Sequence, residues 1–209
     1  MTYRIFIDGG AGTTGLQVHE RLVAHPLVEP VLLDDARRKD AGARRAMMGD
    51  CDLTILCLPD DSARESAAMA TEVGARVIDA SSAHRTADGW AYGFAELAGD
   101  MRADIAAARQ ISNPGCYPTG FLALTRPLVD AGLIPADAAL TVPAVSGYSG
   151  GGKGMIARHQ DGDLPPHGAY GLALAHKHLP EMKHYAGLTT APIFMPSVGS
   201  FYALSLIHI

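Results

Sequence analysis

Cys116 lies in a segment whose residue types suit nucleophilic chemistry, Ser112-Asn113-Pro114-Gly115-Cys116-Tyr117-Pro118-Thr119-Gly120. Asn-Pro-Gly is typical of a tight turn, and Pro118 is well placed to open a helix that the apolar run 121–124 continues. A thiol near a helix N-terminus faces unpaired N–H groups and the positive end of the helix dipole, which favour a thiolate. The segment therefore predicts a cysteine nucleophile. The alternative is a buried, inert cysteine.

Two histidines with an acid close behind them follow in His176-Lys177-His178-Leu179-Pro180-Glu181. This pattern matches a general acid or base with an orienting carboxylate, the kind of partner that a cysteine nucleophile needs. Plain surface histidines are one alternative. A metal site is another, and it is less favoured because the sequence offers no closed ligand set beyond this pair. The pattern leaves open whether His176 or His178 transfers the proton.

A glycine-rich loop near the start of the chain indicates a dinucleotide site. The loop Gly9-Gly10-Ala11-Gly12-Thr13-Thr14-Gly15 follows a strand predicted over residues 4–8 and precedes apolar residues at roughly helical spacing. Glycines let the backbone approach a pyrophosphate, and the helix start supplies N–H donors. We expect all seven loop residues to bind a nicotinamide cofactor in a Rossmann domain.

The residues after the second predicted strand, 28–33, give opposite indications about that cofactor. Asp34 and Asp35 suit the ribose 2′-hydroxyl of NAD. The basic run 37–39 suits the 2′-phosphate of NADP, and a solvated charge cluster is the plain alternative. We expect NADP, with Arg37 at the phosphate, and leave NAD open.

The elements that must position these groups alternate between strands and helices. Further strands are predicted at residues 52–59, 76–79 and 139–145, and helices at residues 60–73 and 121–131, the last kinked or restarted at Pro127. Residues 80–85 follow a strand at the edge where open α/β sheets bind ligands, so Arg85 is either an anion clamp or a surface arginine. Residues 146–154 nearly match a phosphate-binding loop but have Gly154 where Ser or Thr is required, which favours a flexible loop beside a substrate.

Composition limits the class of protein. A chain of 209 residues with 48% hydrophobic content suits one large domain or two small ones. A net charge of −5 without a charged tail argues against nucleic-acid binding. The sequence shows neither a basic leader nor an apolar span of membrane length, and its three cysteines form no CxxC pair. We therefore expect a reduced cytoplasmic protein without membrane or metal.

Taken in this order, the glycine loop, the Asn113–Thr119 motif, the Ser146–Lys153 loop and the His176–Glu181 motif resemble N-acetyl-γ-glutamyl-phosphate reductase. The likeness is to the short form of this arginine-biosynthesis enzyme and runs from about residue 3 to about residue 203. It implies a Rossmann domain at residues 1–113 and a second α/β, semialdehyde-dehydrogenase-like catalytic domain at residues 114–209. It also implies a small-molecule substrate and, for the full-length protein, a homo-oligomer.

The resemblance implies a role for each motif. Cys116 would attack the acyl phosphate and release phosphate, and NADPH would reduce the resulting thioester to the semialdehyde. His176 would be the acid/base, with His178 beside it. The residues implied to line the substrate are Arg85, Ser146, Gly147, Tyr170 and Glu181.

The end of the chain departs from the resemblance. The family continues through more of the catalytic sheet and a helix, whereas this chain ends in residues 204–209, which one frame of a common transposon sequencing adapter encodes. We expect a truncated reading frame and an incomplete catalytic domain. The alternatives are an aspartate-semialdehyde-dehydrogenase-like enzyme and a non-catalytic cofactor-binding fragment. A thiol hydrolase is less favoured because it leaves the glycine loop unexplained.

Overall fold

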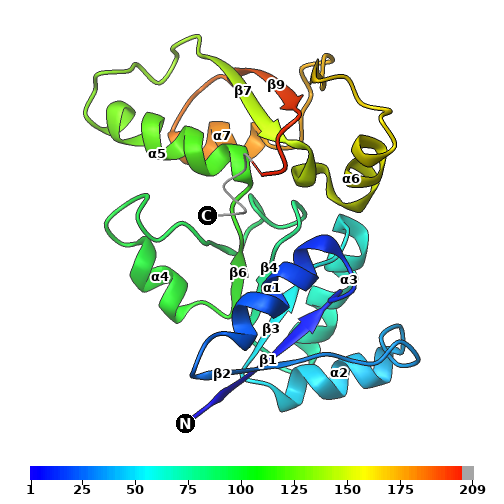
Figure 1. The fold of residues 1–209 in the computed structure, drawn as a ribbon. Helices are drawn as coiled ribbons and strands as arrows, with labels where there is room; N and C mark the ends of the chain where they lie inside the picture. Colours follow the sequence, from blue (N-terminus) through cyan, green and yellow to red (C-terminus); the bar gives the residue numbers. More distant parts are fainter. Residues whose placement is uncertain (204–209) are drawn as a thin grey trace. The chain divides into compact units, whose positions relative to one another are not determined.

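The computed structural model describes residues 1–203, and its chain divides into two compact units at the bond between Asn113 and Pro114 (Figure 1). The six residues expected to be an artefactual tail, 204–209, lie outside the described residues. None of the helices within residues 1–203 has both the length and the apolar character needed to cross a bilayer.

Unit 1 is built on a parallel six-stranded sheet with the strand order β2-β1-β3-β4-β6-β5. Its central strand β3 carries the apolar run that the sequence predicts as a buried strand. The strands are β1 (Tyr3–Asp8), β2 (Val28–Val31), β3 (Leu53–Leu56), β4 (Val77–Asp79), β5 (Ala91–Tyr92) and β6 (Gln110–Ser112). This arrangement confirms the predicted Rossmann-type domain.

Four helices accompany this sheet: α1 (Thr13–Val23), α2 (Ala41–Asp50), α3 (Asp60–Glu72) and α4 (Met101–Ala107). Met48 of α2 and Ala67 of α3 pack with Phe6, Leu56 and Val77 of the strands in one buried cluster. This cluster, in which α2 and α3 pack against the sheet, is therefore one part of the core of unit 1, and Ile7, Tyr92 and Ile111 are buried outside it.

Strand β2 is shorter than the 28–33 strand that the sequence predicts. It occupies an edge of the sheet and contains Pro30. Proline has no N–H to donate, so it is tolerated at an edge, where one side of the strand needs no partner.

Unit 2 contains a three-stranded sheet with the order β7-β9-β8, in which β9 (Ile193–Gly199) pairs parallel with β7 (Thr141–Gly147) and antiparallel with β8 (His167–Ala169). Just past β8, the backbone N–H of Tyr170 donates to the carbonyl of Pro196 at 3.0 Å. The helical elements are α5 (Cys116–Asp130), the 3₁₀ turn η1 (Tyr148–Gly151), α6 (Gly152–Gln160) and α7 (Leu179–Ala186). Mixed pairing of this kind confirms a second α/β domain.

Helix α5 excludes one of the two outcomes predicted at Pro127. The sequence predicts either a kink or a restart there, and α5 runs from Cys116 to Asp130 with Pro127 inside it, so the helix does not restart. The kink stays a prediction. The carbonyl of Pro127 accepts the N–H of Ala131 at 3.0 Å, so the last turn closes normally. The helix begins two residues before Pro118, and Cys116 is its first residue.

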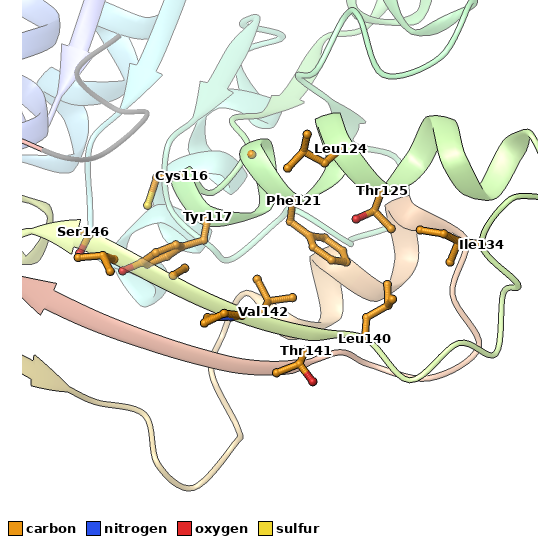
Figure 2. Close-up of a pocket in the computed structure, with 14 residues that line it drawn as sticks. Cys116, Tyr117, Phe121, Leu124, Thr125, Ile134, Leu140, Thr141, Val142 and Ser146 are labelled. Carbon is orange, nitrogen blue, oxygen red and sulfur yellow. The ribbon is translucent and has the colours of Figure 1, made fainter.

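The two faces of the unit 2 sheet differ in exposure. Helix α5 covers one face, where Phe121 points toward β7, whereas Thr141 points to the opposite side (Figure 2). Val145, Ile193 and Met195 on that opposite side are 48%, 48% and 52% exposed. We call this side the outer sheet face, and its exposed residues are Thr141, Pro143, Val145, His167, Ala169, Ile193 and Met195. None of these seven is Asp, Glu, Lys or Arg.

Candidate active site

Cys116 is the first residue of α5, and Gly115 is the N-cap. The side chain of Thr119 closes the first turn by donating to the Gly115 carbonyl at 2.8 Å. The cysteine is half-buried and unpaired with either other cysteine of the chain. Its position places the thiol where the helix N-terminus favours negative charge, as a nucleophile requires.

Glu181, in the first turn of α7, holds the turn that carries Cys116. Its carboxylate is 1% exposed, and Oε1 accepts the backbone N–H of Gly115 at 2.7 Å. A buried carboxylate needs such donors because burial without them costs several kcal/mol. In this geometry Glu181 bonds the backbone of the residue that precedes Cys116. The substrate contact expected of Glu181 stays a prediction.

Tyr117 connects the cysteine to the histidine motif. Its ring lies 6.4 Å from the ring of His176, 6.0 Å from that of His178 and 4.9 Å from that of Phe194, centroid to centroid. Its hydroxyl lies 3.3 Å from the hydroxyl of Tyr170. The side chain that follows Cys116 therefore packs against both candidate acid/base residues.

The two histidines of the motif have different surroundings. His178 is 6% exposed and occupies the N-cap position of α7, whereas His176 is only half-buried. The backbone N–H of His178 donates to Nδ1 of His176 at 3.2 Å, which leaves Nε2 as the nitrogen for proton exchange. Burial, followed by the charge of Lys177, lowers the pKa of His176 below its usual value. His176 thus has the exposure and the fixed ring orientation of an acid/base.

Tyr170 belongs to the same cluster. Its ring makes an edge contact with His176 at 5.9 Å. Burial raises the pKa of the Tyr170 hydroxyl strongly, and the bond to Tyr117 and the nearby Cys116 act in the same direction. Tyr170 therefore remains protonated and can serve as a hydrogen-bond donor.

A cavity of about 450 Å³ extends from Cys116 along the space between α5 and β7 (Figure 2). Ser146 lies near the cysteine end of this cavity and is 7% exposed, and Gly147 is the last residue of β7. The far end is lined by apolar side chains such as Ile134 and Leu140. Cys116, the reactive side chain of the lining, therefore lies at one end of the cavity, whereas Thr125 and Thr141 lie toward the other.

Arg85 lies in unit 1, in the loop after β4. It is 8% exposed, which excludes the alternative of a plain surface arginine. Its Nε donates to the carbonyl of Asn113 at 3.0 Å, and an Nη group donates to the carbonyl of Ala80 at 3.3 Å. The guanidinium is thus fixed against the strand end that leads to Cys116.

The glycine loop lies between β1 and α1 and borders a cavity of about 650 Å³. A Cβ on Gly15 would lie 2.5 Å from the carbonyl oxygen of Gly9, and Gly9 itself has φ +91°. Both positions therefore require glycine. Gly12 is the N-cap of α1, so the N–H groups of the helix start face the loop. A cradle that excludes side chains in this way fits a dinucleotide phosphate.

Charged side chains at the far side of this cavity pair with one another. Arg37 bonds Asp34 at 3.0 Å, and this bond lowers the pKa of Asp34. Arg38 pairs with Asp35 at 2.9 Å. Arg38 and Lys39 line the cavity together with both acids, whereas Arg37 is not among its lining residues in the described part of the chain. Cations and anions thus remain close together at this site.

Two functional contacts were missed by the sequence interpretation. Glu181 and Gly115 are 66 residues apart, and no local spacing indicates that they meet. Tyr117 could have been noticed because it follows the cysteine inside a turn motif, but its packing against His176 and His178 depends on the tertiary fold.

Comparisons with known proteins follow the two units. A family model described as semialdehyde dehydrogenase, NAD binding domain, matches residues 4–106. A second, described as semialdehyde dehydrogenase, dimerisation domain, matches residues 116–203.

Curated relatives of the chain are named as N-acetyl-gamma-glutamyl-phosphate reductases. The chain is 47% identical to N-acetyl-gamma-glutamyl-phosphate reductase 2 of Nostoc sp., covering 99% of this chain and 66% of that protein. It is 50% identical to N-acetyl-gamma-glutamyl-phosphate reductase 2 of Pseudomonas putida, covering 94% and 64%. It is also 50% identical to the Sinorhizobium medicae reductase, covering 96% and 67%. The chain therefore spans about two thirds of the length of these relatives.

Solved structures support the fold. Aspartate semialdehyde dehydrogenase II of Vibrio cholerae aligns with a TM-score of 0.66 at 13% identity, covering 97% of this chain and 71% of that one. The Candida albicans aspartate semialdehyde dehydrogenase solved with NADP aligns with a TM-score of 0.65 at 14% identity, covering 97% and 69%. At such identities the likeness shows the architecture alone.

Proposed function

The chain belongs to the N-acetyl-γ-glutamyl-phosphate reductase family, and on this premise we propose that it reduces N-acetyl-γ-glutamyl phosphate to N-acetylglutamate semialdehyde through a thioester on Cys116. The observation that carries the proposal is the position of Cys116, the first residue of α5, beside a tyrosine that packs against His176 and His178. The names of the relatives supply the substrate.

Cys116 performs the first step. Its thiolate attacks the carbonyl carbon of the acyl phosphate, a C–S bond forms, and the C–O bond to phosphate breaks as inorganic phosphate leaves. The backbone N–H groups at the start of α5 are suited to stabilise the oxyanion of the tetrahedral intermediate. The bond between Glu181 and the Gly115 N–H supports this geometry by fixing the residue before the nucleophile.

His176 is the proposed acid/base. It exchanges a proton through Nε2, because Nδ1 accepts the backbone N–H of His178. His178, buried at the α7 N-cap, then acts by orienting the neighbouring ring. Arg85, Ser146, Gly147 and Tyr170 remain proposed substrate contacts.

A nicotinamide cofactor fits unit 1. The seven residues 9–15 form the proposed phosphate cradle, and when bound the nicotinamide supplies the hydride that reduces the thioester to the aldehyde. We propose NADP as the preferred form. Arg38 and Lys39, which line the cavity, are better placed than Arg37 to hold the 2′-phosphate. Asp34 and Asp35 line the same cavity and suit the 2′-hydroxyl of NAD. Measured affinities for NADPH and NADH therefore decide between NADP and NAD.

The experiment is a comparison of the unaltered chain with Cys116→Ser. We expect NADPH oxidation driven by N-acetyl-γ-glutamyl phosphate, and a thioester mass on the Cys116 peptide when cofactor is omitted. The serine variant should lose both turnover, by at least about 10³-fold, and the thioester. A Cys116→Ser protein that retains activity would contradict the proposal.

The same assay separates the alternatives. A substrate panel containing aspartyl phosphate tests an aspartate-semialdehyde-dehydrogenase-like enzyme. Cofactor binding without any thioester would indicate a non-catalytic cofactor-binding fragment.

We further propose a homo-oligomer that acts in the cytoplasm. Support for self-association comes from the dimerisation-domain match over residues 116–203 and from the uncharged outer sheet face in the same residues. Support for a reducing compartment comes from three free cysteines.

A further inference from the structure

Asp79, at the end of β4, is the centre of a buried polar cluster that the proposed chemistry does not use. Its side chain is fully buried, and Oδ1 accepts the backbone N–H of Ser81 at 2.9 Å. Oδ2 accepts the Ser81 hydroxyl at 2.7 Å and Nδ1 of His84 at 2.6 Å. A carboxylate accepts only, so Nδ1 of His84 carries a proton. Three donors on one carboxylate compensate its removal from water.

His84 is held from a second side by an aromatic ring. Its imidazole stacks on the indole of Trp90 with centroids 4.0 Å apart and planes 9° from parallel. The ring is therefore fixed in position by Trp90 and in rotation by Asp79. Neither residue lies at the chain's glycine loop or at its histidine motif.

The residue that follows His84 in the chain is Arg85, and this arginine bonds the backbone of Asn113. Arg85 Nε donates to the Asn113 carbonyl at 3.0 Å, and the Asn113 N–H donates to the Asp79 carbonyl at 2.7 Å. Both main-chain polar groups of Asn113 are thus held by the segment 79–85. Asn113 is exposed and lies three residues before Cys116.

We propose that Asp79 and His84 are positioning residues that hold Arg85 against the Asn113 carbonyl and so set the geometry of the turn carrying Cys116. The inference rests on the proposed function only in taking Cys116 as the nucleophile. Neither residue touches the substrate in this role. The Asp79–His84 bond acts through Arg85 on the backbone of Asn113, three residues before Cys116 in the chain.

The test is the rate at which iodoacetamide labels each cysteine in the unaltered chain and in variants, read peptide by peptide by mass spectrometry over a range of pH. His84→Phe keeps a flat ring on Trp90 but loses the donor to Asp79. His84→Asn restores a donor near the Nδ1 position without the ring. We expect His84→Phe to slow Cys116 labelling about five- to tenfold and His84→Asn to restore most of it.

Two further variants complete the design. Arg85→Gln leaves the Asp79–His84 bond in place and removes the guanidinium, and it should slow Cys116 labelling as His84→Phe does. His25→Phe, at an exposed histidine of the same unit, is the matched control and should label like the unaltered chain.

Cys57 is an internal control for general loosening, because burial raises its pKa to about 12 and keeps it unreactive. If His84→Phe also exposes Cys57 to labelling, the Cys116 labelling rate in the Arg85→Gln variant decides whether the inference holds. Labelling of Cys116 at the unaltered rate in Arg85→Gln, or in a His84→Phe protein whose Cys57 stays protected, overturns the inference. If Cys116 of the unaltered chain labels no faster than Cys51, the nucleophile itself is wrong and the proposed function fails with it.

Discussion

At the scale of single residues, the ring of His176 has two neighbours that shape its behaviour: the backbone N–H of His178 on Nδ1, and the side chain of Lys177 beside it. The ring can accept that N–H only while Nδ1 is deprotonated. Because its pKa is lowered, the neutral ring persists to lower pH than a free histidine would allow, whose pKa is about 6.5. The acidic limb of activity should therefore lie below that value.

Lys177→Gln tests this reasoning. Removing the lysine charge removes the smaller of the two causes that lower the pKa of His176, so the acidic limb of kcat/KM should move to higher pH by a few tenths of a unit. The measurement is a pH profile of NADPH oxidation, with Lys183→Gln on the exposed last turn of α7 as the control. If Lys177→Gln leaves the acidic limb of the kcat/KM profile unmoved, a group other than His176 titrates there. The same conclusion follows if the acidic limb is still present in His176→Asn.

Residue types and spacing were sufficient to single out Cys116 and the histidine motif as candidate site residues. In both cases the neighbouring residues in the sequence indicate the chemistry. Residue types and spacing did not indicate that Glu181 bonds Gly115, which lies far along the chain, and they did not find Asp79 or His84. A buried hydrogen bond between distant segments leaves no periodic pattern, so only the fold reveals it.

At the scale of elements, the turn between β1 and α1 depends on the close approach of Gly15 to Gly9. Gly15→Ala should weaken NADPH binding by at least about tenfold, because the new methyl group would meet the Gly9 carbonyl and displace the loop. Fluorescence titration with NADPH measures the change.

Gly49→Ala is the matched control for this substitution. A Cβ on Gly49 has no neighbour within 4 Å in the described residues, and the residue lies inside α2. Alanine there should leave the affinity for NADPH unchanged and stabilise the protein by about 0.5–1 kcal/mol. Equal affinity for NADPH in Gly15→Ala and Gly49→Ala would contradict the assignment of the loop.

The elements were predicted unevenly from sequence. Strands β1 and β3 and helix α3 stand out because buried parallel strands are continuous apolar runs and their boundaries carry Pro and Gly. Helix α5 does not restart at Pro127, because propensity is local, whereas burial of Phe121 and Leu122 on the same helix favours its continuation.

At the scale of the whole molecule, the uncharged outer sheet face predicts self-association. Sheets that pack face to face bury the side chains of one face of each strand, and charge at such a face is costly. The double substitution Val145→Glu/Met195→Glu should raise the dissociation constant of an oligomer at least about 100-fold. Sedimentation velocity over a concentration series measures this shift.

Val23→Glu, at an exposed valine in the last turn of α1, controls for added charge on an apolar surface position. It should sediment like the unaltered chain. A double variant that keeps the mass of the unaltered protein would exclude the outer sheet face as the site of assembly. The sequence alone indicated an oligomer only through resemblance, since strand pairing decides which residues share a face.

Pro196 has no backbone N–H, and this absence decides where the pairing of β8 with β9 ends. In an antiparallel ladder, residues that face each other as a bonded pair exchange two hydrogen bonds. Tyr170 donates its N–H to the Pro196 carbonyl, but proline has no N–H to return to Tyr170. The pairing of β8 with β9 therefore stops at Ala169, and the chain turns away at Gly171, where φ is +64°. The proline on the middle strand β9 thus leaves Tyr170 outside the ladder, and the Tyr170 hydroxyl lies 3.3 Å from the hydroxyl of Tyr117.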